Sequence, residues 1–229
     1  ALRELAAAER AIEDVQDLSR GHLRLGITPT FITYLIGPLT AELYARHPGV
    51  SLTVVEMSQD NIEAGLLADD LDVGIAFMGA PVPGIEFAAL FTEHLGLVTS
   101  GPRAAGLPAA LPVRALDDVQ LALLSSDFLT RTHIDTYFAA HHVDPRIMVE
   151  ANSVQALTEI VQRTPLATVL PDAVTHDHPH LTPVPLDPPI PTRTVAILRR
   201  DGGYHSAAAS AFVGLTHELV ADRGYAPPG

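Results

Sequence analysis

Short apolar runs alternate with longer stretches of helical periodicity along most of this 229-residue chain. In the first half, the pattern predicts strands over residues 22–27, 51–57, 71–77, 85–91 and 94–100, and helices over residues 30–47 and 60–69. Strands that alternate with helices are typical of βαβ units, in which neighbouring strands run parallel and helices cover the sheet. This order restricts the chain to the α/β class.

A second block with the same alternation begins near residue 120. It predicts strands over residues 120–126, 146–151, 166–171 and 193–200, and helices over residues 130–142, 152–163 and 205–223. The proline-rich residues 176–191 are expected to form loop or sheet edge, because proline has no N–H to donate to a neighbouring strand. The chain therefore contains two α/β blocks and no tandem repeat of fixed period.

The Pro/Gly/Ala-rich residues 101–112 separate the two blocks and indicate a crossing from one lobe to the other. We predict that lobe I comprises residues 22–99 and 194–229, and that lobe II comprises residues 100–193. Two lobes joined by two crossings imply a cleft between them.

The first 21 residues predict a separate helix. Leu5, Ala8, Ile12 and Val15 form an apolar seam over two heptads, and Gly21 follows in a position that suits a helix C-terminus. Two heptads are too short to hold a coiled coil unaided. The segment is either an amphipathic helix packed on its own domain or the end of a longer linker helix.

Composition excludes several classes of function. The formal net charge is −13 with only 14 basic residues, which disfavours DNA binding by this chain, since phosphate contacts need clustered cations. Cysteine is absent, which excludes disulfides, thiol catalysis and cysteine-based zinc sites. No apolar run reaches the roughly 18 residues that span a bilayer, so we expect a cytoplasmic globular protein without a membrane partner.

Small polar residues follow four of the predicted strands, each directly before a helix. They are Thr28-Pro29-Thr30, Ser58-Gln59, the stretch from Ser125 to Thr130, and Asn152-Ser153. The first N–H groups of a helix lack internal partners and carry partial positive charge, so such loops can hold a small anion without basic side chains. Alternatively, each hydroxyl caps its own helix. Asp60 with Glu63, and Asn152 with Gln155, also have capping-box spacing.

Arg131 is the only cation in these loops, and two roles are open to it. It pairs either with an anion in the cleft or with Asp127 or Asp135. A second ambiguous feature is the run of alternate histidines, His176, His178 and His180, which on an extended strand would face one way and ligate a metal. Pro179 and the lack of an obvious fourth ligand favour a solvated loop, so no metal site is predicted.

Signatures of catalysis are missing. Ser125 and Ser126 lack a G-x-S-x-G setting, and neither a dinucleotide-binding nor a P-loop glycine pattern occurs. Plentiful carboxylates show no pairing suited to acid–base work. We therefore expect neither an enzyme nor a cofactor.

Several stretches together resemble one family. They are RGHLRLG followed by TPT, then HPGVSLTVVE and LDVGIAF, and they resemble the LysR-type transcriptional regulators downstream of their DNA-binding segment. The resemblance covers essentially the whole chain. Within the family, TPTFITYLIGPL, LLSSDFLTRTHIDTYF and RTVAILRRDGGYHSAAASAFV are most similar to regulators of bacterial cyanate-degradation operons.

The resemblance implies an effector-binding domain of two Rossmann-like lobes, like the type II periplasmic binding proteins. Residues 1–21 would end the linker helix through which such proteins dimerise. A winged helix-turn-helix that binds DNA would lie upstream of this chain. Homodimers or tetramers are expected, with RNA polymerase as a further partner, and the effector would be a small anion, cyanate if the closer resemblance holds.

The family's effector contacts map onto three loops of this chain. The matching residues are Thr28, Pro29, Thr30, Ser58, Asp127, Phe128, Thr130 and Arg131. All except Phe128 coincide with the helix-start loops identified above, and Phe128 would add an apolar wall.

The alternative function is a bilobed solute-binding protein that serves a transporter. Such a protein is exported, and export requires a signal peptide or a lipidated cysteine, neither of which occurs in this sequence. The start of the chain therefore favours the regulator.

Overall fold

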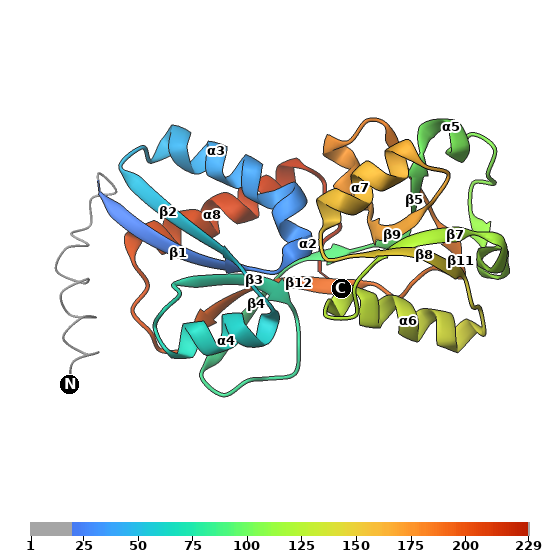
Figure 1. The fold of residues 1–229 in the computed structure, drawn as a ribbon. Helices are drawn as coiled ribbons and strands as arrows, with labels where there is room; N and C mark the ends of the chain where they lie inside the picture. Colours follow the sequence, from blue (N-terminus) through green and yellow to red (C-terminus); the bar gives the residue numbers. More distant parts are fainter. Residues whose placement is uncertain (1–19, 229) are drawn as a thin grey trace. The chain divides into compact units, whose positions relative to one another are not determined.

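The computed structural model describes residues 20–228 and divides the chain into two compact units (Figure 1). Unit 1 contains the described residues up to Thr92 and those from Thr194 onwards, and unit 2 is Glu93–Arg193. The predicted linker helix lies outside the described residues. Gly21, expected at its end, is the first residue of strand β1.

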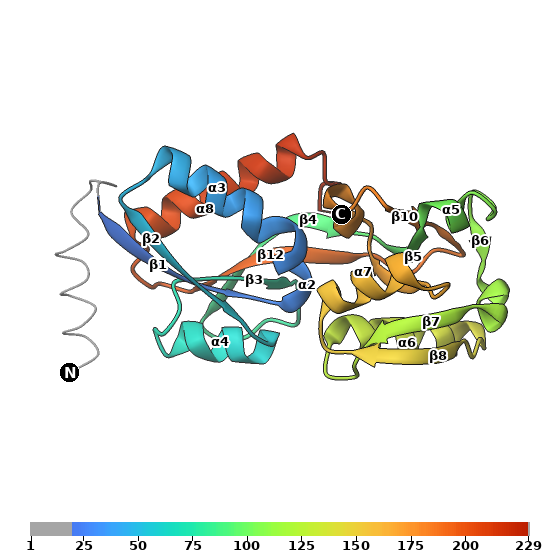
Figure 2. The same cartoon turned by 45° about the horizontal axis from the view of Figure 1, so that its top comes forward.

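Unit 1 is a five-stranded sheet with helices on both faces. Its elements are β1 (Gly21–Ile27), α2 (Pro29–Phe31), η1 (Ile32–Ile36), α3 (Gly37–Arg46), β2 (Val50–Glu56), α4 (Gln59–Leu67), β3 (Val73–Phe77), β4 (Ile85–Glu93), β12 (Arg193–Arg200) and α8 (Ala207–Asp222). The strand order is β2-β1-β3-β12-β4, with β1 parallel to β2 and β3, and β12 antiparallel to β3. Helices α3 and α8 cover one face and α4 the other (Figures 1 and 2).

Burial in unit 1 follows from this layering. Every residue of the central strand β3 is buried, because helices cover both of its faces. Ile62 and Leu66 of α4 pack with Leu198 of β12 in one apolar cluster. The helix predicted over residues 30–47 is present as one helical run that starts at Pro29, but a π-helical turn, Ile32–Ile36, interrupts it.

Unit 2 is a second α/β layer structure. Its elements are β5 (Leu95–Ser100), α5 (Gly101–Ala104), β6 (Leu111–Pro112), η2 (Val113–Asp118), β7 (Gln120–Leu124), α6 (Leu129–His141), β8 (Arg146–Ala151), α7 (Val154–Arg163), β9 (Thr168–Pro171), η3 (Asp172–Asp177), β10 (Leu181–Val184) and β11 (Leu186–Asp187). Strands β7 and β8 are parallel, and β5 is antiparallel to both β9 and β10. No helix within residues 20–228 is both long and apolar enough to cross a bilayer.

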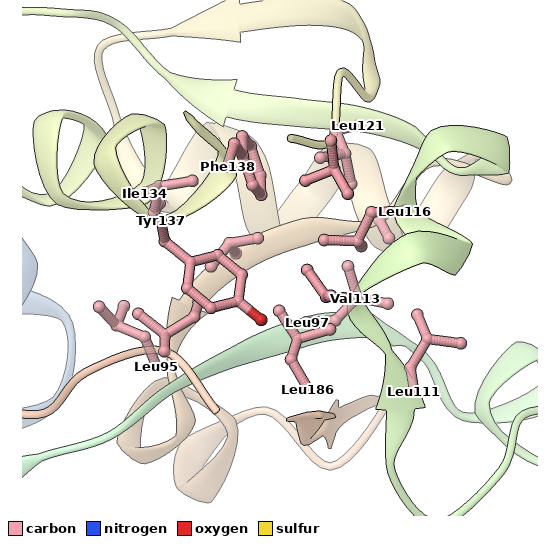
Figure 3. Close-up of a cluster of buried hydrophobic side chains, with 14 of the residues drawn as sticks. Leu95, Leu97, Leu111, Val113, Leu116, Leu121, Ile134, Tyr137, Phe138 and Leu186 are labelled. Carbon is pink, nitrogen blue, oxygen red and sulfur yellow. The ribbon is translucent and has the colours of Figure 1, made fainter. Parts of the chain in front are cut away.

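The core of unit 2 lies between α6 and the strands. Ile134, Tyr137 and Phe138 of α6 contribute to one cluster with Leu97 of β5 and Leu121 of β7 (Figure 3). The Tyr137 hydroxyl donates a hydrogen bond to the carbonyl oxygen of Pro188 at 2.5 Å. Burial, aided by the nearby charge of Asp187, raises the pKa of Tyr137 to about 12, so the phenol stays a neutral donor.

The first crossing between the units differs from the prediction. Residues 101–112 do not cross between lobes but form α5, a loop and β6 inside unit 2. The reason is strand pairing: β5, which precedes them, pairs with β9 and β10 of unit 2. The chain passes from unit 1 to unit 2 at Thr92–Glu93 and returns at Arg193–Thr194.

Both predicted capping boxes are wrong by one or two residues. Helix α4 begins at Gln59 with Ser58 as its N-cap, so Asp60 lies inside the first turn, and Glu63 accepts a hydrogen bond from the Gln59 amide instead. Helix α7 begins at Val154, and its N-cap is Ser153, not Asn152. The Ser153 hydroxyl accepts a hydrogen bond from the backbone N–H of Ala156 at 3.3 Å.

Replacing Ser153 with alanine is expected to lower the free energy of unfolding by about 1 kcal/mol, because the Ala156 N–H loses its acceptor. Asn152→Ala, one residue outside the helix, is the matched control and is expected to change it by less than about 0.5 kcal/mol. Urea unfolding followed by far-UV circular dichroism measures both. A larger loss for Asn152→Ala than for Ser153→Ala would contradict the assigned cap.

Candidate functional site

Two of the four polar loops lie side by side in unit 1. Thr28 follows β1 and Ser58 follows β2, and these strands are parallel, with Ile27 opposite Glu56 at their carboxyl ends. The backbone N–H of Met57 donates to the carbonyl oxygen of Ile27 at 3.1 Å, which joins the two loops. The sheet therefore brings both helix starts to one edge.

Thr28 is the most unusual residue of this edge. It is only 4% exposed, and its hydroxyl finds no hydrogen-bond partner among the described residues. Its backbone N–H donates to the carbonyl oxygen of Ile75 at 3.1 Å, and its backbone is extended (φ −72°, ψ 147°) directly before the helix. A buried hydroxyl without a partner is costly, so Thr28 suits a site that a ligand or water completes.

The neighbours of Thr28 continue the helix. Pro29 occupies the first helical position, where its missing N–H costs nothing and its fixed φ angle is favourable. Thr30 follows it and is 2% exposed.

Ser58 is exposed, and its hydroxyl does not cap α4. The next residue, Gln59, is buried, and its amide exchanges two hydrogen bonds with the backbone of Phe77, at 3.1 and 3.2 Å. Gln59 thereby fixes the start of α4 against the end of β3. Sequence alone does not predict this contact, since Gln59 and Phe77 lie 18 residues apart.

In unit 2, the loops after β7 and β8 also lie together. Leu124 stands opposite Ala151 at the carboxyl ends of these parallel strands, and the backbone N–H of Ser125 donates to the carbonyl oxygen of Ala151 at 2.9 Å. The Ser125 hydroxyl, like that of Thr28, is buried without a partner among the described residues. Asp127 is exposed, and Phe128 is the half-buried N-cap of α6, where no side chain caps the helix.

The structure shows one of the two roles open to Arg131. Its guanidinium pairs with Asp135 at 2.9 Å and donates to the carbonyl oxygen of Leu124 at 2.8 Å. Glu150 lies farther away, at 3.5 Å. Arg131 is 8% exposed. Its bond to the Leu124 carbonyl oxygen holds the start of α6 against the end of β7, while the Asp135 pair, which the sequence offered as one option, lies within α6.

Thr130 belongs to a buried polar cluster that the sequence analysis missed. Its hydroxyl accepts a hydrogen bond from the Arg193 guanidinium at 3.2 Å, and Arg193 also forms an ion pair with Glu93. The side chains of Glu93 and Arg193 are 1% and 11% exposed. Glu93 and Arg193 are 100 residues apart, and the one available signal was a glutamate at the end of the strand β4.

The predicted site residues thus form two groups. Thr28, Pro29, Thr30 and Ser58 lie at one edge of unit 1, and Asp127, Phe128, Thr130 and Arg131 lie at the corresponding edge of unit 2. Of the four loops, only Ser153 uses its hydroxyl as a cap. That both groups contact one effector stays a prediction.

The histidine run lacks the extended shape that a metal site required. His176 lies in the helical turn η3, and the backbone N–H of His178 donates back to Thr175. Within residues 20–228, no three His, Asp or Glu side chains are grouped so as to hold a metal ion.

Comparison with known proteins agrees with this architecture. The family model described as LysR substrate binding domain matches residues 16–221. The chain is 23% identical, over 92% of its length and 71% of the relative's, to YwbI of Bacillus subtilis (strain 168), an uncharacterised HTH-type transcriptional regulator.

Among solved structures, the CcmR regulatory domain of Synechocystis PCC6803 in complex with 2-PG matches with a TM-score of 0.74 at 20% identity, over 87% of this chain and 97% of that one. Full-length CbnR in complex with its target DNA matches with a TM-score of 0.68 at 19% identity, over 94% of this chain and 75% of that one. These likenesses confirm the predicted two-lobed α/β fold. These relatives are transcriptional regulators, not enzymes. The family model matches nine-tenths of the residues of this chain, so the chain belongs to the LysR substrate binding domain family.

Proposed function

We propose that this chain is the effector-sensing part of a transcriptional regulator and that its effector is a small anion, with cyanate as the first candidate. Membership of the LysR substrate binding domain family supports the general role. The anionic class is supported by the candidate loops, which offer helix starts and few side-chain acids, namely the exposed Asp127 and, in the first turn of α4, the exposed Asp60.

The observation that carries the proposal is the pair of buried hydroxyls without described partners, Thr28 and Ser125. Each lies at the carboxyl edge of a parallel strand pair, directly before or close to a helix start. A hydroxyl there donates one hydrogen bond to an anion, and the backbone N–H groups of the helix start supply further donors. A side-chain cap would have used such N–H groups within the protein, but among the four loops only Ser153 forms one.

Thr130 fits the same role. Because its oxygen accepts from Arg193, its own O–H is free to donate, and hydrogen bonds in such a chain strengthen one another. Thr30 and Ser58 supply further hydroxyls, Pro29 fixes the loop, and Phe128 supplies apolar surface. Arg131 adds positive potential while its guanidinium stays with Asp135.

In this proposal the loops of both units contact one anion. An effector with different contacts in two arrangements of the protein shifts the population between them, which is what regulation requires. A tri-atomic ion makes few contacts, so the dissociation constant is expected to be roughly micromolar to millimolar.

The output of the regulator would lie outside this chain. YwbI is named as an HTH-type regulator, and this chain matches 71% of its length. CbnR has been solved at full length with its target DNA. We propose that an additional segment of the whole protein binds DNA, that the protein acts as a dimer or tetramer, and that RNA polymerase is a further partner.

Thr28→Val and Thr130→Val are expected to weaken cyanate binding at least tenfold each, because a hydrogen bond to a charged group is worth about 1.5–3 kcal/mol. Valine keeps the shape of threonine and removes the hydroxyl. Thr168→Val is the matched control, since the Thr168 hydroxyl is also buried without a described partner but lies within strand β9. Isothermal titration calorimetry measures all four proteins.

Two results would contradict the proposal. If Thr28→Val and Thr130→Val both bind cyanate with wild-type affinity, the hydroxyls of these loops do not contact the effector. No heat from cyanate, thiocyanate, nitrate or bicarbonate at millimolar concentration would remove the small-anion effector itself.

A further inference from the structure

Unit 2 contains an open pocket at the end opposite to the candidate effector loops. It has a volume of about 350 Å³ and is lined by Arg103, Asp117, Asp118, Gln120, Arg146 and Pro165. Gln120 and Arg146 are the first residues of the parallel strands β7 and β8, whereas Ser125 follows the carboxyl end of β7 (Figure 2). Given the usual rise per residue of a β-strand, β7 is about 13 Å long, and this length separates the pocket from the loop that contains Ser125. We call this feature the amino-end pocket.

Both arginines of the amino-end pocket lack a protein partner. Within residues 20–228, Arg103 and Arg146 form no ion pair or side-chain hydrogen bond, whereas Arg24, Arg131 and Arg193 all pair with carboxylates. A guanidinium offers a planar fork of donors that matches a carboxylate, so the pocket holds two unused carboxylate receptors.

The acidic residues of the amino-end pocket are also available. Asp117 uses one oxygen to accept the backbone N–H of Asp144 at 2.8 Å, and Asp118 makes no side-chain hydrogen bond to the described residues. The Gln120 side chain adds a neutral donor and acceptor. Both aspartates stand in the turn η2, directly before β7.

Charge decides which ligands fit. Two guanidinium groups and two carboxylates give the pocket a formal charge of zero. A simple anion would therefore be repelled by the aspartates, and a simple cation would be repelled by the arginines. A molecule that carries both charges finds a counter-charge for each of them in the pocket. The volume is near the lower end of the range for ligand pockets, roughly 300–1,000 Å³, which limits the ligand to a small one.

We propose that the amino-end pocket binds a free α-amino acid, with its carboxylate on Arg103 and Arg146 and its ammonium group on Asp117 and Asp118. This ligand is distinct from the small anion proposed for the effector loops. The protein would then respond to two small molecules of different chemistry.

The test is calorimetry and thermal unfolding of the protein with each of the twenty amino acids at up to 10 mM. At least one is expected to bind with a dissociation constant below 10 mM and to raise the melting temperature, since ligands of the folded state stabilise it. Acetate and methylammonium, which carry one charge each, are expected to bind at least tenfold more weakly.

Arg146→Gln and Asp118→Asn are each expected to weaken the amino acid at least tenfold. Both side chains are exposed and unpaired within the described residues, so far-UV circular dichroism should show an unchanged fold, and either variant alone decides the matter. Arg200→Gln, an exposed arginine of unit 1, is the control and should leave the affinity unchanged.

The proposal is overturned if every amino acid binds more weakly than 10 mM, if acetate binds as tightly as the best amino acid, or if either pocket variant keeps wild-type affinity. None of these outcomes depends on cyanate binding, because the two sites share no residue.

Discussion

Glu93→Ala is expected to lower the free energy of unfolding by about 3–5 kcal/mol, because it removes one partner of a buried ion pair, the carboxylate that pairs with the Arg193 guanidinium. Glu93 is 2% exposed and lies at the end of β4, where the chain enters unit 2. Arg193 begins β12, where the chain leaves unit 2, and it also donates to Thr130. The neutral Thr130 hydroxyl does not replace a carboxylate there.

Glu86→Ala is the matched control, because the same two strands carry a second pair at their other ends. Glu86 of β4 pairs with Arg199 of β12 at 3.2 Å, but the Glu86 side chain is 49% exposed. An exposed pair contributes about 0–1 kcal/mol. Urea unfolding followed by circular dichroism measures both variants, and equal losses would show that burial does not set the strength of the Glu93–Arg193 pair.

The contrast between these two pairs shows what sequence alone could predict. The period of apolar residues located the main strands and helices, because it records which face of each element is covered, but it missed the short elements within residues 101–118 and 172–187. Strand β3 and helix α4 were found in this way. The pairing of Glu93 with Arg193, 100 residues away, has no local signature and required the three-dimensional structure.

The misplaced crossing has the same origin. Residues 101–112 have a composition suited to a linker, but composition does not say which strands pair. Because β5 pairs with β9 and β10, the boundary moves to Thr92–Glu93, before β5. The predicted cap of α7 was wrong for a different reason. Asn152 and Ser153 are both good capping residues, and only the backbone angles decide which one stands at the helix start.

The candidate site was partly predictable because parallel strands align their carboxyl ends. This rule places Thr28 beside Ser58, and Ser125 beside Ala151, without further information. The rule does not predict which hydroxyls form hydrogen bonds within the protein. Ser153 caps its helix and Thr130 accepts from Arg193, whereas Thr28 and Ser125 stay without described partners.

Gly74→Ala is expected to lower the free energy of unfolding by about 1–3 kcal/mol, because the added methyl group overfills a packed interface. Gly74 lies in the fully buried strand β3, and a Cβ atom there would stand 2.5 Å from Cγ2 of Ile62 and 3.2 Å from Cβ of Leu198. Carbon atoms do not approach so closely, so α4 or β12 must shift.

Gly214→Ala is the matched control in the same unit and should have the opposite sign. Gly214 lies within α8, and a Cβ atom there meets nothing within 4 Å, so alanine is expected to stabilise the protein by about 0.8–1 kcal/mol through helix propensity. Adding Ile62→Ala removes the methyl group that the new Cβ atom at position 74 would strike, and the Gly74→Ala/Ile62→Ala double variant should lose less stability than the sum of the single changes. If the double variant instead loses the sum of the two single losses, the residues 62 and 74 do not interact, and the clash of the new Cβ atom with Ile62 is not the cause of the destabilisation.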